Sequence, residues 1–265
     1  MADRQSKILK LFKVLLKLDH PPAGPNWVRF IFDDPTRTAK AIVRFAKSQP
    51  PFNYHSAYAA IKDRIELGIS LEVARKSVTM KGAPSGRSQN RELVEAFFKY
   101  DLRRQYSASN PITFEREFFR VSRDVVIPIA PLSIIRERGT FVPIFVCGWS
   151  SNPLFRLQRR LLMTIYEDAF LSLTDYQNSP AEVLFFPRND EGEEPRREPE
   201  VWHRGDYELL SKRELDECVE IFIFARNQAR EVLLAEIDQM QTQAEAEKSA
   251  PATPLGDQPD LFKKQ

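Results

Sequence analysis

The hydrophobic pattern of this chain changes its period near Pro111. Before that point apolar residues recur at helical spacing, and prolines or glycines separate the predicted helices, which cover about 6–18, 35–47, 55–67, 71–78 and 89–104. After it, the segments 112–121, 125–129 and 141–148 are rich in β-branched and aromatic residues. Because helices and strands are separated along the chain, the sequence predicts an α+β fold.

Local signals mark the ends of several predicted helices. Asp34 precedes a proline, a pattern typical of an N-cap and first turn. Gly68 is expected to close one helix and Ser70 to cap the next. Residues 211–214 read Ser-Lys-Arg-Glu, a capping box that predicts a long helix reaching at least Asp238.

The middle of the chain predicts a small sheet. A helix of about 20 residues is expected from Pro153 through Leu173, followed by a buried strand at 182–187 and a charged loop at 190–200. Pro128 and Pro143 fall inside β-rich runs and favour edge strands or bulges. The predicted organisation is a basic helical region (1–105), a small mixed sheet with two long helices (106–240) and a disordered tail (241–265).

The charge of the chain is unevenly distributed. Residues 1–110 carry 20 Lys and Arg against 10 Asp and Glu, whereas the remainder carries 19 against 27. The basic half could contact nucleic acid or face the acidic half, and it contains no known nucleic-acid-binding motif. The four lysines of the first predicted helix share about a third of the helical wheel, which favours a core or partner-docking helix over a membrane-surface helix; they are Lys7, Lys10, Lys13 and Lys17.

The composition predicts a cytoplasmic protein. The sequence contains no apolar run of about 18 residues and no signal-peptide cleavage pattern. Cys147 and Cys218 are far apart and lack metal-ligand spacing, so they are expected to be buried free thiols. No membrane contact is expected.

The sequence does not predict an enzyme, a metal site or a cofactor. It lacks phosphate-binding glycine loops and nucleophile motifs, and its three histidines are isolated in sequence. A metal-dependent nuclease is the best enzymatic alternative, with Asp168, Asp175 and Glu182 as carboxylates. That pattern requires a lysine two residues after the strand glutamate, where this chain has Leu184.

The last dozen residues contain the most specific motif of the chain. Phe262 is the only aromatic residue after Ala225, and it follows a polar segment that cannot form a core. The sequence 258–262, Gln-Pro-Asp-Leu-Phe, resembles the pentapeptide with which bacterial proteins bind the replication sliding clamp. The resemblance implies that Gln258 is a polar anchor, that Asp260 fits the third position, and that Leu261 and Phe262 fill an apolar pocket. Pro259 replaces the favoured leucine.

This resemblance implies that the partner is the DNA polymerase III β sliding clamp. A clamp-binding protein without an active site would occupy the shared pocket and inhibit replication elongation by competition. The strategy is similar to that of the clamp-binding toxin of the SocAB toxin–antitoxin pair, whose antitoxin is an adaptor for the ClpXP protease. Two alternatives stay open: a DNA-binding accessory factor for repair or a mobile element that uses the clamp as a landing site, and a scaffold with an accidental motif.

Overall fold

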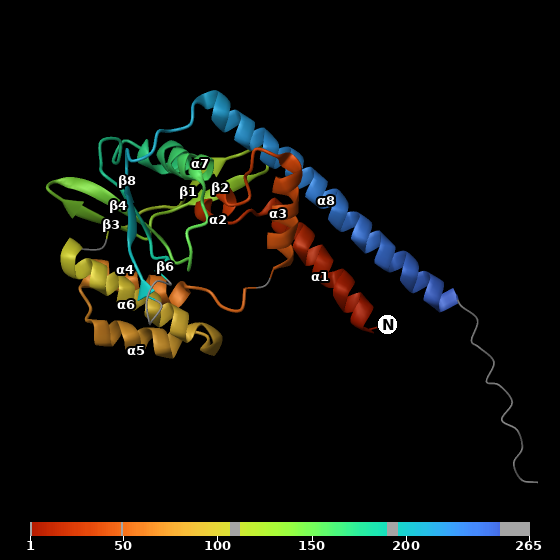
Figure 1. The fold of residues 1–265 in the computed structure, drawn as a ribbon, viewed down its shortest axis with the longest axis horizontal. Coiled ribbons are helices and arrows are strands. Elements are labelled where there is room, and N and C mark those ends of the chain that lie inside the picture. The colour runs from red at the N-terminus through yellow and green to blue at the C-terminus, as the bar shows by residue number, and fades with distance from the viewer. Residues whose placement is uncertain (1, 49, 107–111, 190–195, 250–265) are drawn as a thin grey trace, which may run out of the picture.

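The computed structural model describes residues 2–48, 50–106, 112–189 and 196–249 and confirms the α+β class (Figure 1). The helices are α1 (Ala2–Asp19), α2 (Gly24–Val28), α3 (Pro35–Lys47), α4 (His55–Leu67), α5 (Leu71–Lys81), α6 (Arg87–Arg104), α7 (Arg156–Tyr166) and α8 (Lys212–Ser249). The strands are β1 (Glu117–Arg120), β2 (Val126–Ile129), β3 (Ser133–Glu137), β4 (Thr140–Cys147), β5 (Glu182–Phe185), β6 (Arg188–Asn189), β7 (Arg196–Arg197) and β8 (Glu200–His203).

Three predicted caps of the N-terminal helices are confirmed. The Asp34 carboxylate accepts hydrogen bonds from the backbone N–H groups of Thr36 and Arg37, at 2.9 and 3.2 Å. Gly68 follows α4 with φ of 67°, the left-handed conformation that glycine adopts without steric cost. The Ser70 hydroxyl caps α5. These caps satisfy backbone groups that a helix leaves open at its ends.

The main sheet has four strands in the order β3-β4-β5-β8. β3 and β4 form an antiparallel hairpin whose turn is the Arg138-Gly139 pair, both with positive φ. β4 runs parallel to β5, and β5 runs antiparallel to β8. The predicted small mixed sheet is therefore confirmed, and its central strand β5 is buried along its whole length.

The expectation that Pro143 lies on an edge strand or a bulge is wrong. β4 lies between β3 and β5, and Pro143 is opposite Ile134 of β3. Pairing with β5 starts only at Ile144, so one side of β4 is unpaired at the proline. An internal strand accommodates the missing N–H at such a position. Pro128, in contrast, lies in the two-stranded sheet of β1 and β2, where every strand is an edge.

Other predicted boundaries also differ from the structure. The helix expected from Pro153 starts at Arg156, and its last turn, Glu167–Leu171, is π-helical. Strand β3 was not predicted, and in the predicted loop 190–200 the described residues form β7 and the start of β8. β7 pairs with β6, its neighbour along the chain, and β8 pairs with β5 about 20 residues before it. Both are short, and their propensity alone does not separate them from the charged loop.

Two hydrophobic clusters cover the two faces of the main sheet. Alternate residues of β4 and β5 point to opposite faces: Phe145 and Val183 join the first cluster, and Ile144 and Leu184 the second. The first cluster also contains residues of α1, α2, α3, α7 and α8, and the second those of α4, α5 and α6. Figure 1 shows these two helix groups on opposite sides of the sheet. Residues 1–105 are therefore divided between two clusters, and both parts pack against the 106–240 range.

α8 leads from the core toward the tail. The predicted capping box is present, because Glu214 accepts a hydrogen bond from the Ser211 backbone N–H at 2.7 Å and the Ser211 hydroxyl accepts one from the Glu214 N–H at 3.3 Å. The helix continues through Ser249, so the first part of the predicted disordered tail, residues 241–249, is helical. Residues 250–265 lie outside the described part of the chain.

Candidate functional site: a groove between α1, α3 and α8

The predicted clamp-binding residues Gln258, Asp260, Leu261 and Phe262 lie outside the described residues. The structure does describe the helix that carries them and the surface beside that helix. The last α8 residue in the core is Ile237, and the helix ends at Ser249. At 1.5 Å per residue, α8 therefore extends about 18 Å beyond its last core residue before the tail begins.

Ion pairs tie α8 to α1 and α3. Asp19, at the end of α1, pairs with both Arg226 and Arg230 of α8. Further along, Lys47 at the end of α3 pairs with Glu236. The two arginines lie where the C-terminal carbonyls of α1 attract positive charge. These contacts hold the three helices in a fixed arrangement and define a groove between them.

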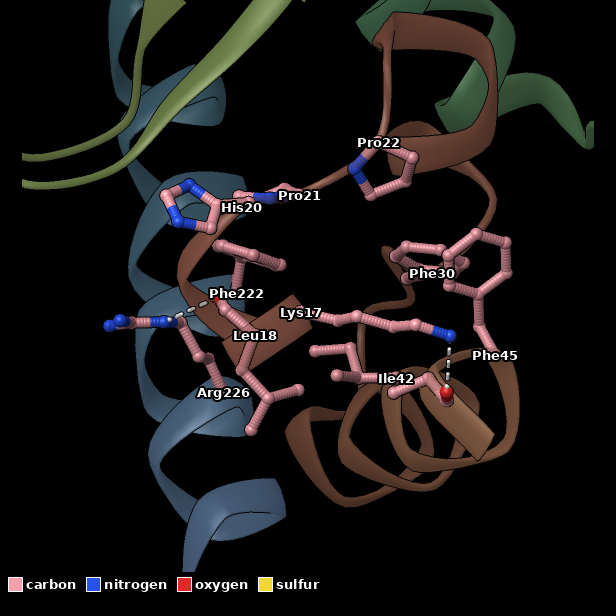
Figure 2. A pocket seen from close by; sticks show the side chains of 11 residues that line it. Lys17, Leu18, His20, Pro21, Pro22, Phe30, Ile42, Phe45, Phe222 and Arg226 are labelled. Atoms are coloured by element: carbon pink, nitrogen blue, oxygen red, sulfur yellow. Dashed lines mark hydrogen bonds between the residues drawn. The ribbon is translucent and has the colours of Figure 1, made fainter. Parts of the chain in front are cut away.

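One end of the groove is an apolar pocket of about 100 Å³ (Figure 2). Its wall includes the rings of Phe30 and Phe45, whose centroids are 4.7 Å apart. Figure 2 shows the Lys17 side chain extending across the pocket toward Phe45, and its Nζ donates a hydrogen bond to the Ala46 carbonyl at 3.2 Å. The remaining lining residues are Leu18, His20, Pro21, Pro22, Ile42, Phe222 and Arg226.

The other end, which we call the lysine groove, has a volume of about 330 Å³. It shares Lys17 and Ala46 with the apolar pocket, so the two lie side by side. Its apolar lining is Leu11, Val14, Ala46 and Met240, its cations are Lys7, Lys10, Lys13, Lys17 and Lys47, and its one acidic residue is Glu236.

Three cations of the lysine groove have no described acidic partner: Lys17, which donates to the Ala46 carbonyl, and two exposed lysines of α1. Lys10 and Lys13 are exposed and make no ion pair with any carboxylate in the part of the chain that the structure describes. Lys47, in contrast, is neutralised by Glu236. An apolar floor beside free ammonium groups suits a ligand that carries both carboxylates and apolar side chains.

The carboxylates of the nuclease alternative are not assembled into a metal site among the described residues. Glu182 accepts a hydrogen bond from Arg104 Nε at 2.8 Å and a short one from the Tyr106 hydroxyl. Asp175 instead lines a separate cleft near β1, and Asp168 lies in the π-helical turn. Within residues 2–48, 50–106, 112–189 and 196–249, no group of three or more His, Cys, Asp or Glu side chains is placed to hold a metal ion.

Arg197 is the most buried cation of the structure's described part and was missed by the sequence analysis, which placed it in a charged loop. Its side chain is fully buried. Its Nη1 donates to the carbonyls of Gly148, Trp149 and Phe186 at 3.0, 3.1 and 2.9 Å, and its Nη2 donates to the Tyr54 hydroxyl at 2.9 Å. The guanidinium therefore joins the segments that follow β4 and β5 to the start of α4.

The two cysteines are buried free thiols, as predicted. Burial raises the pKa of Cys147 to about 12 and that of Cys218 to about 11. Both thiols are therefore protonated at neutral pH, which makes them poor nucleophiles and metal ligands. Two of the histidines lie apart from these thiols. His203 Nδ1 lies 3.6 Å from Asp206 Oδ2, and His20 lines the apolar pocket.

In comparisons with known proteins, no family model, curated sequence or solved structure matches this chain. Among the described helices, none combines the length and the apolar composition that crossing a lipid bilayer requires.

Proposed function

We propose that residues 258–262 bind the bacterial DNA polymerase III β sliding clamp and that the protein inhibits replication elongation by occupying the clamp's peptide pocket. The observation that carries the proposal is the Gln-Pro-Asp-Leu-Phe sequence. Leu261 and Phe262 are the apolar pair that would enter the pocket, and Gln258 is the polar anchor at its mouth.

The position of the peptide supports this function. It is joined to a helix that is fixed to the body by ion pairs at Asp19 and Lys47 and that continues beyond its last core residue. Fewer than a dozen residues separate Ser249 from Gln258. A peptide joined to the body in this way can reach a partner without opening the core.

Competition accounts for inhibition without catalysis. Because polymerase and repair factors share one pocket on the clamp, an occupant lowers their bound fraction according to its concentration and affinity. A protein with this action has to be controlled in the cell. We propose a cytoplasmic toxin whose amount is set by an antitoxin that serves as a proteolytic adaptor for the ClpXP protease.

The first test measures binding of the full-length protein to the purified clamp by surface plasmon resonance. Leu261→Ala/Phe262→Ala removes both apolar side chains, and we expect affinity to fall by two orders of magnitude or more, since each buried side chain of this size contributes about 1.5–3 kcal/mol. Leu255→Ala is the matched control, because it removes an apolar side chain of the same tail outside the pentapeptide. Equal binding by wild type and the double variant would refute the proposal.

A second measurement tests inhibition directly. Primer extension by a clamp-dependent polymerase should slow as the protein is added, and an excess of clamp should restore the rate. Leu261→Ala/Phe262→Ala should have no effect on extension. Slowing that excess clamp does not relieve would indicate another target.

A DNA-binding accessory factor is the second candidate, favoured by the exposed cations of α1 and α3. Lys40 and Arg44 of α3 are exposed, as are Lys10 and Lys13 of α1. If these residues contact phosphates, affinity for duplex DNA should fall steeply with salt, and Lys10→Glu/Lys13→Glu should reduce the slope. Absence of binding at low salt would leave this candidate without support.

A further inference from the structure

We propose that the lysine groove binds the chain's own segment 257–262, so that the clamp-binding peptide is held against α1 and α8 when no partner is present. The groove offers an apolar floor at Leu11 and Val14 and two exposed lysines, Lys10 and Lys13, without described acidic partners. A named segment of the same chain has the matching chemistry.

The segment contains both kinds of group that the groove requires. Asp257 and Asp260 supply carboxylates, and Leu261 and Phe262 supply the apolar pair. Docked along α1, the carboxylates would face the ammonium groups of Lys10 and Lys13, and the apolar pair would cover the floor. A nucleic-acid backbone would match the lysines and leave the floor uncovered.

The length of the chain permits this contact. Met240, which lines the groove, is nine residues before the end of α8, a distance of about 14 Å along the helix. The twelve residues from 250 to Leu261 span at most about 40 Å when extended. The segment can therefore turn back past the end of α8 and still reach the groove with residues to spare.

The same length favours the chain's own tail over other occupants. A tether of about a dozen residues holds its end at an effective concentration on the order of millimolar. A second copy of the chain would have to reach that concentration in solution to compete. A groove of modest affinity is therefore filled first by the segment already attached beside it.

Docking would regulate the proposed function, and this consequence depends on that function. Leu261 and Phe262 cannot occupy the groove and the clamp pocket at the same time. The groove would then lower the apparent affinity for the clamp by the fraction of time the segment is docked. The docking itself requires no clamp and can be tested alone.

The experiment places p-benzoylphenylalanine at position 262 of the full-length protein. After irradiation, mass spectrometry identifies the crosslinked residues, which are expected to belong to α1, the end of α3 or the 236–240 part of α8. A mixture of ¹⁵N-labelled and unlabelled protein separates crosslinks within one chain from those between two chains.

Charge reversal tests the role of the lysines. Lys10→Glu/Lys13→Glu should lower the crosslink yield at least about fivefold, because two attractive contacts become repulsive. Lys76→Glu/Lys99→Glu is the matched control: it makes the same charge change at exposed lysines of α5 and α6, which pack on the opposite face of the sheet, and should leave the yield unchanged.

A second probe avoids the bulky crosslinker. The native cysteines are buried, so a nitroxide can be attached selectively at Gln265→Cys. If the segment docks, the nitroxide should broaden the backbone amide NMR signals of residues 10–17. These signals should sharpen in the Lys10→Glu/Lys13→Glu variant.

Three outcomes would overturn the docking proposal: crosslinks only between chains, crosslinks elsewhere on the surface, or a yield that the lysine variant does not change. The clamp measurement separates this proposal from the proposed function. Crosslinks without clamp binding would support docking and reject the function, and clamp binding without crosslinks would do the reverse. If both hold, Lys10→Glu/Lys13→Glu should bind the clamp more tightly than wild type.

Discussion

Replacing Arg197 by methionine is expected to be one of the most destabilising substitutions at a buried position of this protein. Methionine keeps most of the length and apolar volume of the side chain and removes the guanidinium. The Arg197 side chain has no exposed surface, and its Nε lies 3.2 Å from Glu92 Oε1 in an ion pair. The substitution therefore removes an internal charge together with its hydrogen bonds.

The magnitude follows from the groups left behind. Three backbone carbonyls and the Tyr54 hydroxyl lose a charged donor, and each unsatisfied buried group costs about 1–3 kcal/mol when it cannot find another partner. Glu92 keeps its hydrogen bonds from Arg188. Allowing for relaxation, we expect the free energy of unfolding to fall by about 3–5 kcal/mol, as for a broken buried ion pair.

Urea denaturation followed by tryptophan fluorescence measures this loss. Arg196→Met is the matched control, since Arg196 is the exposed neighbour in the same strand, and its effect should stay within about 0.5 kcal/mol. If Arg197→Met does not fold, Arg197→Lys should fold with an intermediate loss, because one ammonium group cannot serve all the acceptors. A difference of less than about 1 kcal/mol between Arg197→Met and Arg196→Met would refute the argument.

Three further predictions concern the capping box of α8, the N-cap of α3 and the two cysteine thiols. A hydrogen bond from Arg160 and the capping box hold the pKa of Glu214 at about 2, below its ordinary 4.5, so its ionisation stabilises the fold above pH 4.5. Glu214→Gln should therefore lower the melting temperature at neutral pH, and the difference should vanish as the pH falls toward 2. Asp34→Ala should cost about 1 kcal/mol in urea denaturation, whereas Asp33→Ala, beside it, should have little effect. A disulfide-exchange reagent should modify both native cysteines only in denaturant, and fast labelling of either in the folded protein would contradict their burial.

The parts of the fold that could be predicted are those set by local chemistry. The Asp34 and Ser70 caps, the left-handed Gly68 and the capping box at Ser211 each satisfy backbone groups of a neighbouring turn, so a few adjacent residues determine them. The buried strand β5 was also visible, because its four residues are covered on both faces and form a continuous run.

The parts that could not be predicted depend on partners distant in sequence. The place of Pro143 in an internal strand follows from where pairing with β5 begins, and no residue near it reports that register. The burial of Arg197 is similar: adjacent arginines in a charged segment look equivalent, and only the carbonyls at the ends of β4 and β5 distinguish them. Predicting the groove likewise requires knowing that α8 packs against α1 and α3, which are distant from it in sequence. The sequence did predict the lysine face of α1.

The lysine groove need not bind tightly to affect the clamp. If the effective concentration of the attached segment is about 1 mM, a groove that binds the free segment with a Kd of about 1 mM is half-filled and weakens clamp binding about twofold. A groove with a Kd of about 0.1 mM weakens it about tenfold. Since the proposed groove contact uses exposed lysines and the proposed clamp contact is mainly apolar, salt should weaken docking more than clamp binding. Added salt should therefore narrow the difference in clamp affinity between a synthetic peptide of residues 255–265 and the full chain, and an unchanged difference would argue against electrostatic docking.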